Sequence, residues 1–131
     1  MRARILRPEF FSDAQMCLLT EGARLLYEFT WLLCDRDGRI QLDYEQWRAQ
    51  FFPLCDYSAE QISGYFAELC GSEDNGNFRP KYYRYQIDGE WYAVCPTFTK
   101  HQRIHDNEPP SGLPPPPEEV LAKLKLRQQN S

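Results

Sequence analysis

The sequence lacks the short motifs by which the common enzyme classes are identified. It has no GxSxG nucleophile elbow, no P-loop, no HExxH zinc motif and no glycine-rich dinucleotide loop. Its five cysteines include no CxxC pair, so neither a structural zinc site nor a dithiol redox motif is indicated. We therefore expect a protein that is not an enzyme and that uses no metal and no cofactor.

Long apolar runs are missing as well. No stretch approaches the ~18 consecutive apolar residues of a membrane helix, and the charged N-terminus has no apolar region of the kind found in secretory signals. The odd number and wide spacing of the cysteines favour buried free thiols in a reducing compartment. We expect a cytoplasmic protein without a membrane partner. The cysteines are Cys17, Cys34, Cys55, Cys70 and Cys95.

The chain does contain enough apolar material for a core. Of its 131 residues, 42% are hydrophobic and 15% are aromatic, which argues against disorder over most of the length. Six prolines in the nine positions 109–117 favour an extended spacer. We predict one domain at residues 1–105, a proline-rich linker at 106–117 and a short helical or disordered tail at 118–131.

Capping residues precede the segments that have helical apolar periodicity. The segment at residues 21–34 is apolar nearly all round, so we expect this helix at the centre of the core. Gly71 suits the C-cap of the last one. The predicted helices span residues 13–19, 21–34, 44–52 and 59–70, with the caps Ser12, Thr20, Asp43 and Ser58.

An Asp-Gly pair at positions 88–89 lies between two aromatic-rich runs, which is a strong β-hairpin signal. A two-residue turn pairs Tyr85 with Tyr92 on an apolar face, and this face should meet the helices. The other face carries Arg84 near Trp91 and should meet solvent or a partner. The hairpin strands are predicted at residues 82–87 and 90–95.

With a further short strand at residues 39–42, the element order is helix, helix, strand, helix, helix, strand, tight turn, strand. This is the order of a winged helix with one extra helix in front. We predict an α+β fold in which a helix-turn-helix core carries a short strand and a two-stranded β-hairpin wing. The domain includes an extra short N-terminal helix, and a proline-rich C-terminal tail follows it.

The net charge of −4 hides an uneven distribution. Residues 1–20 sum to +1, residues 21–75 to −7, residues 76–105 to +3 and residues 106–131 to −1. Cations beside aromatic rings suit nucleic acid, whether double-stranded or single-stranded DNA. The candidate nucleic-acid-binding residues are Arg2, Arg4, Arg7, Arg79, Lys81, Arg84, Trp91, Lys100, His101 and Arg103.

The predicted helix at residues 59–70 would enter the major groove in a typical winged helix, yet it is acidic. Residues 49–78 hold no lysine or arginine and five acids. Such a surface repels phosphate and instead suits a basic protein, or imitates DNA. The candidate protein-interaction residues are Glu60, Gln61, Ser63, Glu68, Glu73 and Asp74.

A family resemblance rests on several segments: residues 4–13 (RILRPEFFSD), 23–40, 52–53, 87–92, 98–105 (FTKHQRIH) and 108–111 (EPPS) with the prolines that follow. These segments are similar to phage and prophage replication proteins that have a DnaD-like, replisome-organiser N-terminal domain. The resemblance implies a winged-helix fold and no catalytic residues. It also implies a role in phage DNA replication inside a bacterial host cell, by binding origin DNA or by organising host replication proteins.

Two hypotheses of function follow from the sequence. In the first, the protein is a nucleic-acid-binding module of the phage replication class that uses its basic residues. In the second, it is an acidic protein-interaction module of a phage or prophage, which docks on or inhibits a host replication or defence protein. Self-association is compatible with both.

Overall fold

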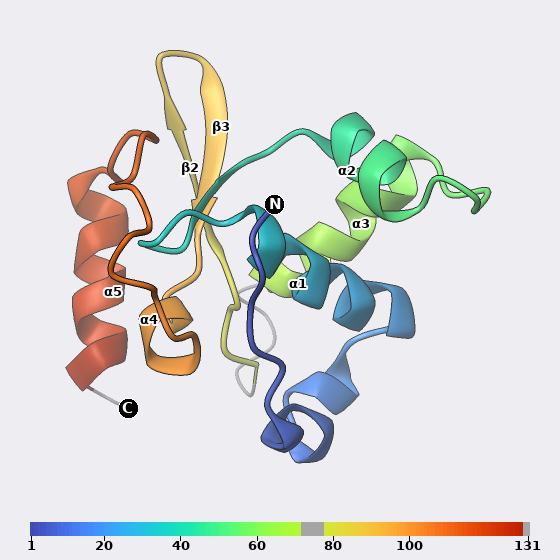
Figure 1. The fold of residues 1–131 in the computed structure, drawn as a ribbon, viewed down its shortest axis with the longest axis horizontal. Coiled ribbons are helices and arrows are strands. Elements are labelled where there is room, and N and C mark those ends of the chain that lie inside the picture. Colours follow the sequence, from blue (N-terminus) through green and yellow to red (C-terminus); the bar gives the residue numbers. More distant parts are fainter. Residues whose placement is uncertain (72–77, 130–131) are drawn as a thin grey trace.

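The computed structural model describes residues 1–71 and 78–129. Within these residues two short 3-10 helices and five α-helices surround a three-stranded antiparallel sheet (Figure 1). The predicted α+β class is therefore confirmed. In chain order the elements are η1 (Pro8–Ser12), η2 (Met16–Leu18), α1 (Glu21–Leu33), β1 (Arg39–Gln41), α2 (Tyr44–Phe51), α3 (Ala59–Cys70), β2 (Tyr83–Ile87), β3 (Glu90–Val94), α4 (Phe98–His101) and α5 (Glu118–Gln129).

The predicted caps begin the three main helices. Thr20 and Asp43 each accept a hydrogen bond from the backbone amide three residues further on, at 3.3 and 3.0 Å. Ser58 accepts from the Gln61 amide at 3.1 Å, and the Gln61 side chain accepts in turn from the Ser58 amide at 2.8 Å. The predictions of α1, α2 and α3 are thus confirmed, with the ends of α1 and α2 one residue earlier than predicted.

The hairpin forms with the predicted register. Tyr85 pairs with Tyr92, and β1 adds to the far side of β3, so the strand order is β1-β3-β2. At the turn, Asp88 and Gly89 have φ angles of 51° and 85°. Both residues have the left-handed backbone conformation that a two-residue turn between twisted strands requires. Asparagine, aspartate and glycine are the residues that tolerate this conformation best.

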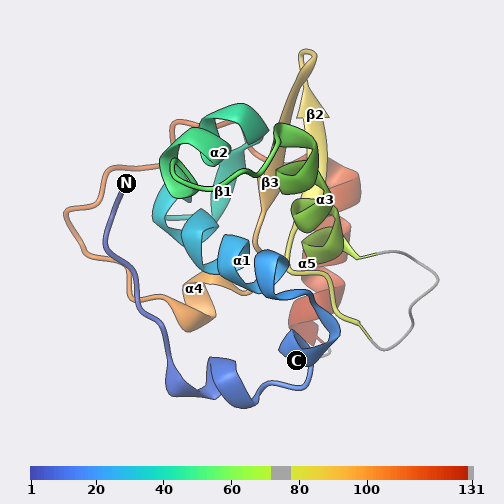
Figure 2. The same cartoon turned by 90° about the vertical axis from the view of Figure 1, so that its right-hand side faces the viewer.

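The apolar face of the hairpin meets a helix, although not one of the first three. Tyr85 and Val94 are buried against Val120 of α5, with Leu124 packed alongside. Figures 1 and 2 show α5 on one side of the sheet and α1 to α3 on the other. The sheet is therefore the middle layer of three, and the C-terminal helix covers its second face.

The opposite face of the hairpin divides into a buried half and an exposed half. Tyr82, Ala93 and Cys95 lie near the base of the hairpin and are buried in the main core. Arg84 and Trp91 lie on the same face but are exposed. The prediction that this whole face meets solvent or a partner is therefore wrong for its base, because α1 and α3 pack there.

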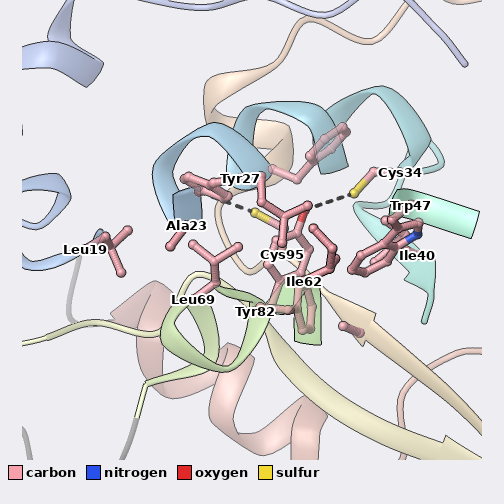
Figure 3. Close-up of a cluster of buried hydrophobic side chains, with 14 of the residues drawn as sticks. Leu19, Ala23, Tyr27, Cys34, Ile40, Trp47, Ile62, Leu69, Tyr82 and Cys95 are labelled. Carbon is pink, nitrogen blue, oxygen red and sulfur yellow. Dashed lines mark hydrogen bonds between the residues drawn. The ribbon is translucent and has the colours of Figure 1, made fainter. Parts of the chain in front are cut away.

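The main core is aromatic and contains a few paired polar groups (Figure 3). The Tyr82 hydroxyl donates to the Thr30 hydroxyl at 2.8 Å and lies 3.3 Å from the Cys34 sulfur. The hydroxyl of Tyr27 lies 3.9 Å from the sulfur of Cys95. Because each of these hydroxyl and thiol groups has a partner, burying them among apolar side chains does not leave a polar atom unsatisfied.

The predicted α-helix at residues 13–19 is wrong. The chain forms η1 and η2 instead, and the Ser12 hydroxyl donates to the Glu9 carbonyl at 3.3 Å rather than capping a helix. The Asp13 carboxylate accepts from the Gln15 amide at 2.8 Å, a local side-chain contact that favours a turn over a helix. Pro8 also starts a turn further upstream, since its fixed φ suits the first helical position.

The C-terminal region turns back onto the body of the protein. The Tyr85 hydroxyl donates to the Pro114 carbonyl at 2.9 Å, and the Ser111 hydroxyl donates to the Asp35 carboxylate. Further along, Val120 packs against Tyr85 and Val94 of the sheet. The proline-rich segment is held by these contacts and does not extend away as a free spacer, and the region predicted to be helical or disordered is helical over Glu118–Gln129.

All five cysteines are free thiols. Cys34 and Cys95 are buried, and burial raises the pKa of both thiols, which keeps them unreactive. The expectation of buried thiols is wrong for Cys17 and Cys55, which are exposed. Cys70 is half-buried, and burial raises its pKa to about 11.

Candidate functional site

Four parts of the chain that are distant in sequence meet around one cavity of about 410 Å³. They are the N-terminal segment, the residues leading into β2, the end of β3 with α4, and the last turn of α5; α1 contributes the back wall. We call this cavity the basic pocket. Its lining residues are Ile5, Arg7, Glu9, Phe10, Asp13, Gln15, Met16, Tyr27, Trp31, Arg79, Lys81, Cys95, Thr97, Phe98, Lys100, His101, Gln102 and Arg127.

The floor of the basic pocket is apolar and largely aromatic. Met16, Tyr27 and Phe98 are buried core residues that reach its surface. Phe10 and Trp31 form an edge-to-face pair in the wall, with ring centroids 5.8 Å apart. Such a floor offers ring faces and edges to a ligand, and it belongs to the rigid core.

The charged residues around this floor are mainly cationic. The lining includes five lysine and arginine side chains and two carboxylates, a formal net charge of +3 with histidine neutral. Arg79 and Lys100 are exposed at the rim. Arg7, also exposed, donates through Nε to the His101 carbonyl at 3.1 Å, and this bond ties the N-terminal segment to α4. The chain as a whole carries −4, so the pocket is a local reversal of charge.

Lys81 is the deepest of these cations, with 7% of its surface exposed. Its backbone amide donates to the Leu69 carbonyl at 2.7 Å, which anchors the residue to the end of α3. Within residues 1–71 and 78–129, the structure records one contact for its ammonium group, the Phe78 ring, whose centroid is 5.6 Å away. Burial, Arg127 and Arg79 lower the pKa of Lys81, and Asp13 partly opposes them.

Arg127 closes the pocket from α5. One of its terminal nitrogens donates to the Pro80 carbonyl, while its Nε is buried with no hydrogen-bond partner in the described part of the chain. The sequence did not indicate Arg127 as a site residue, because residues 118–131 were predicted to form a short helical or disordered tail. The available signal was spacing: Val120, Leu124 and Arg127 stand at i, i+4 and i+7, so they share the face of α5 that packs inward.

His101 brings a titratable group to the rim. Partial burial and the charges of Lys100, Arg7 and Lys81 lower its pKa, while Asp13 raises it. These are the same groups that line the pocket from the N-terminal segment, from the residues before β2 and from α4. Part of each predicted basic cluster therefore lies at one place, the lining of this pocket.

Arg2 and Arg4, which were predicted to bind nucleic acid, form ion pairs within the fold. The Arg4 side chain is 4% exposed and pairs with Glu108, with Nη2 2.7 Å from one carboxylate oxygen and Nη1 3.1 Å from the other. It also donates to the Trp31 and Cys34 carbonyls at 3.2 and 2.9 Å. Arg2 binds the same carboxylate at 2.9 Å. Both arginines therefore hold the N-terminal segment to the fold.

Three other predicted residues lie outside the basic pocket. Arg84 borders a second, shallower hollow beside α3, Trp91 is 49% exposed near the hairpin turn, and Arg103 is exposed after α4. The hairpin turn and the 3-10 helices lie at opposite ends of the molecule in both views (Figures 1 and 2). The structure thus brings together Arg7, Arg79, Lys81, Lys100 and His101.

Within the described residues, some side chains of the predicted acidic surface form contacts inside the fold. Glu68 accepts hydrogen bonds from the Thr20 amide and hydroxyl at 2.9 and 2.7 Å, so it serves the start of α1. Glu60 is exposed on α3, and Ser63 is half-buried. The side chain of Gln61 is engaged in the capping box. Glu73 and Asp74 lie outside the described residues.

Across residues 1–71 and 78–129 no group of three or more histidine, cysteine or acidic side chains is arranged to hold a metal ion. In the same part of the chain, no helix is both long and apolar enough to cross a membrane. Comparisons with family models, with curated proteins and with solved structures found no match to this chain.

Proposed function

We propose that this protein is a non-catalytic nucleic-acid-binding module with a winged-helix fold, and that it holds phosphates at the basic pocket. One observation carries the proposal: cations from separate segments converge on a single cavity in a chain that is acidic overall. Phosphate neutralisation provides most of the sequence-independent affinity for nucleic acid. Ring faces beside the cations suit single strands in particular, because every base can stack on them.

The order and pairing of the elements support the winged-helix part of the proposal. The element order is α1-β1-α2-α3-β2-β3 and the strand order is β1-β3-β2, so a hairpin follows α3, which is the position of the wing in a winged helix. The resemblance of this chain to phage replication proteins points the same way, and it supports a role in phage DNA replication in the cytoplasm of a bacterial host.

The acidic character of α3 makes it a poor groove-binding helix, since nothing on it neutralises phosphate. Glu60 is exposed there, and residues 49–78 supply no cation. The 3-10 helices, which contribute residues to the lining of the basic pocket, lie at the other end of the molecule from the hairpin turn (Figures 1 and 2). We therefore place the nucleic-acid contact at the pocket and not on α3. An acidic protein-docking face remains the competing hypothesis for α3.

The test is the salt dependence of binding to an oligothymidylate of about 12 nucleotides, within the range of single-strand binding sites. Fluorescence anisotropy between about 50 and 200 mM salt gives the slope of log affinity against log salt. The rim variant carries Arg7→Gln, Arg79→Gln and Lys100→Gln, which replaces exposed residues and leaves the core intact. We expect weaker binding and a slope reduced in magnitude by about 2, at about 0.7 for each lost phosphate contact.

A matched control removes the same charge elsewhere. It carries Arg84→Gln, Arg103→Gln and Lys125→Gln, three exposed residues that do not line the pocket. We expect it to retain the wild-type slope. Equal losses in both variants, or salt-independent binding by the wild type, would overturn the proposal. A stable complex with a basic protein that is lost on Glu60→Lys would favour the acidic α3 surface instead.

A further inference from the structure

We propose that the basic pocket receives the phosphomonoester of a nucleotide, with Lys81 binding the phosphate at the bottom and the aromatic wall contacting the base. This inference deepens the proposed function and rests on it. It specifies which chemical group enters the cavity, whereas the proposal above requires only that phosphates gather around it. The same group occurs at the phosphorylated end of a strand and in a free nucleoside monophosphate.

The position of Lys81 argues for a group that enters the pocket. A strand passing over the rim would meet Arg79 and Lys100, which are exposed. Lys81 has 7% of its surface exposed, and no described residue forms an ion pair with it. Most of the side chain is desolvated, while its ammonium nitrogen stays accessible from the cavity, so a ligand that enters can neutralise a charge that the fold leaves unpaired.

Arg127 supplies a second, independent donor beside Lys81. Its Nε is a buried polar atom without a hydrogen-bond partner within the described residues. Both cations line the same cavity, and the charge of Arg127 contributes to lowering the pKa of Lys81. A phosphate between Lys81 and the Arg127 guanidinium would neutralise two charges that repel each other.

The floor of the pocket explains why a strand end fits better than the middle of a strand. Met16, Tyr27 and Phe98 form the floor and belong to the buried core. An internal phosphodiester carries chain on both sides, and both would have to leave through the opening. A terminal phosphate has chain on one side only. It also carries a charge of about −1.5 to −2, which is a better match for two buried cations than the −1 of a diester.

The size and wall of the cavity fit one nucleotide. A volume of about 410 Å³ lies within the range of small-molecule sites. Phe10 and Trp31 lie in the wall, and Trp31 is held in place by Tyr27, whose ring centroid is 5.0 Å away. A base can therefore meet a rigid aromatic surface while its phosphate reaches the cations.

The experiment compares oligothymidylates that differ only in their end group. A labelled strand of about 12 nucleotides is titrated with a 5′-phosphate, with a 3′-phosphate and with hydroxyl groups at both ends. We expect one phosphorylated strand to bind roughly tenfold to hundredfold more tightly than the hydroxyl strand, the range of one charge-assisted contact. Thymidine monophosphate and thymidine are then added as competitors.

Each outcome bears on a different claim. Equal affinity of phosphorylated and hydroxyl strands would overturn this inference and leave the proposed function standing. Absence of binding by all strands, with thymidine monophosphate still bound, would overturn the proposed function and support the pocket as a free-nucleotide site. Displacement by thymidine monophosphate but not by thymidine supports the phosphomonoester. Displacement by thymidine alone would contradict it.

Two variants locate the effect. Lys81→Met should abolish the preference for the phosphorylated end, whereas the matched Lys125→Met, on the exposed surface of α5, should keep it. Arg79→Gln tests the rim without touching a buried residue, and we expect it to reduce the preference severalfold. Far-UV circular dichroism confirms that each variant is folded. A full preference retained by Lys81→Met would contradict the assignment of Lys81 as the phosphate contact.

Discussion

Arg4 and Lys81 are both buried cations, yet their surroundings are opposite. Arg4 meets a carboxylate through two nitrogens and also donates to two backbone carbonyls. Lys81 shares its pocket with the like charges of Arg79 and Arg127, and no described residue neutralises it by an ion pair. Coulombic attraction and hydrogen bonds offset the desolvation of Arg4 within the fold, whereas Lys81 has little to offset its own.

The comparison separates a structural charge from a functional one. The sequence does not distinguish the two residues, because each belongs to a basic cluster and has aromatic or aliphatic neighbours. In the structure, one completes a cluster and the other borders an open cavity. Removing the first should therefore damage the fold, and removing the second should damage binding while leaving the fold as stable as before.

The largest expected effect is that of Arg4→Met. The change leaves Glu108, 5% exposed, as a buried carboxylate with part of its partners gone. Breaking a buried pair in this way costs about 3–5 kcal/mol of unfolding free energy. Urea denaturation measures it, and the double variant Arg4→Met, Glu108→Leu should recover much of the loss. A loss below about 1 kcal/mol would show that the cluster contributes no more than a surface pair.

The second effect is a loss of stability in acid. Hydrogen bonds from Arg4, and the charges of Arg4, Arg2 and Arg36, lower the pKa of Glu108 below its ordinary value of 4.5. A carboxylate with a lowered folded-state pKa stabilises the fold fully above the unfolded value, and this contribution is lost as the pH falls through the folded-state value.

Unfolding free energies measured from neutral pH down to about pH 3 should fall accordingly, through the range in which carboxylates titrate. Glu108→Gln should be less stable at neutral pH and should show a weaker dependence on pH. An unchanged pH profile in this variant would contradict the role given to Glu108.

A smaller effect of opposite sign is expected at Lys81. Burial lowers the pKa of Lys81, so at neutral pH the fold bears the cost of a desolvated ammonium group. Lys81→Met should leave the unfolding free energy unchanged or raise it, by up to about 1 kcal/mol, as is common when a functional charge is removed. A clear destabilisation would mean that Lys81 is a structural residue like Arg4.

The smallest predicted effect concerns His101. Burial and neighbouring cations lower its pKa, and a bound phosphate would raise it, so affinity should increase as the pH falls below the ordinary value of 6.5. The increase should be about two- to fivefold, the range of one exposed charge interaction. A strand with hydroxyl ends isolates the effect from titration of the phosphate, and His101→Asn should remove it. The same pH dependence in both proteins would exclude His101.

Local features of the fold were predictable, and distant contacts were not. The caps Thr20 and Ser58 and the Asp-Gly turn work through neighbours within four residues, so the sequence displays them. The Arg4–Glu108 pair joins residues 104 positions apart, and no local pattern indicates it. The apolar spacing in residues 118–131 indicated the helix α5. It did not indicate where the helix packs, because that depends on which face of the sheet the other helices leave uncovered.

The candidate site shows the same division. The sequence identified the basic clusters because charge is read directly from composition. It did not show that Arg7, Lys81 and Lys100 would meet around one cavity while Arg4 turned inward, since burial and pairing depend on the packed fold.

The most direct test of the account uses the three tryptophans as reporters of three regions. Trp31 lines the basic pocket, Trp47 is buried in the core beside α3, and Trp91 is exposed near the hairpin turn. Their indole N–H signals in a nitrogen-15 correlation spectrum can be followed during titration with a 5′-phosphorylated oligothymidylate. We predict that the Trp31 signal shifts while those of Trp47 and Trp91 stay in place. A shift of Trp91 with Trp31 unchanged would place nucleic acid on the hairpin and contradict the account.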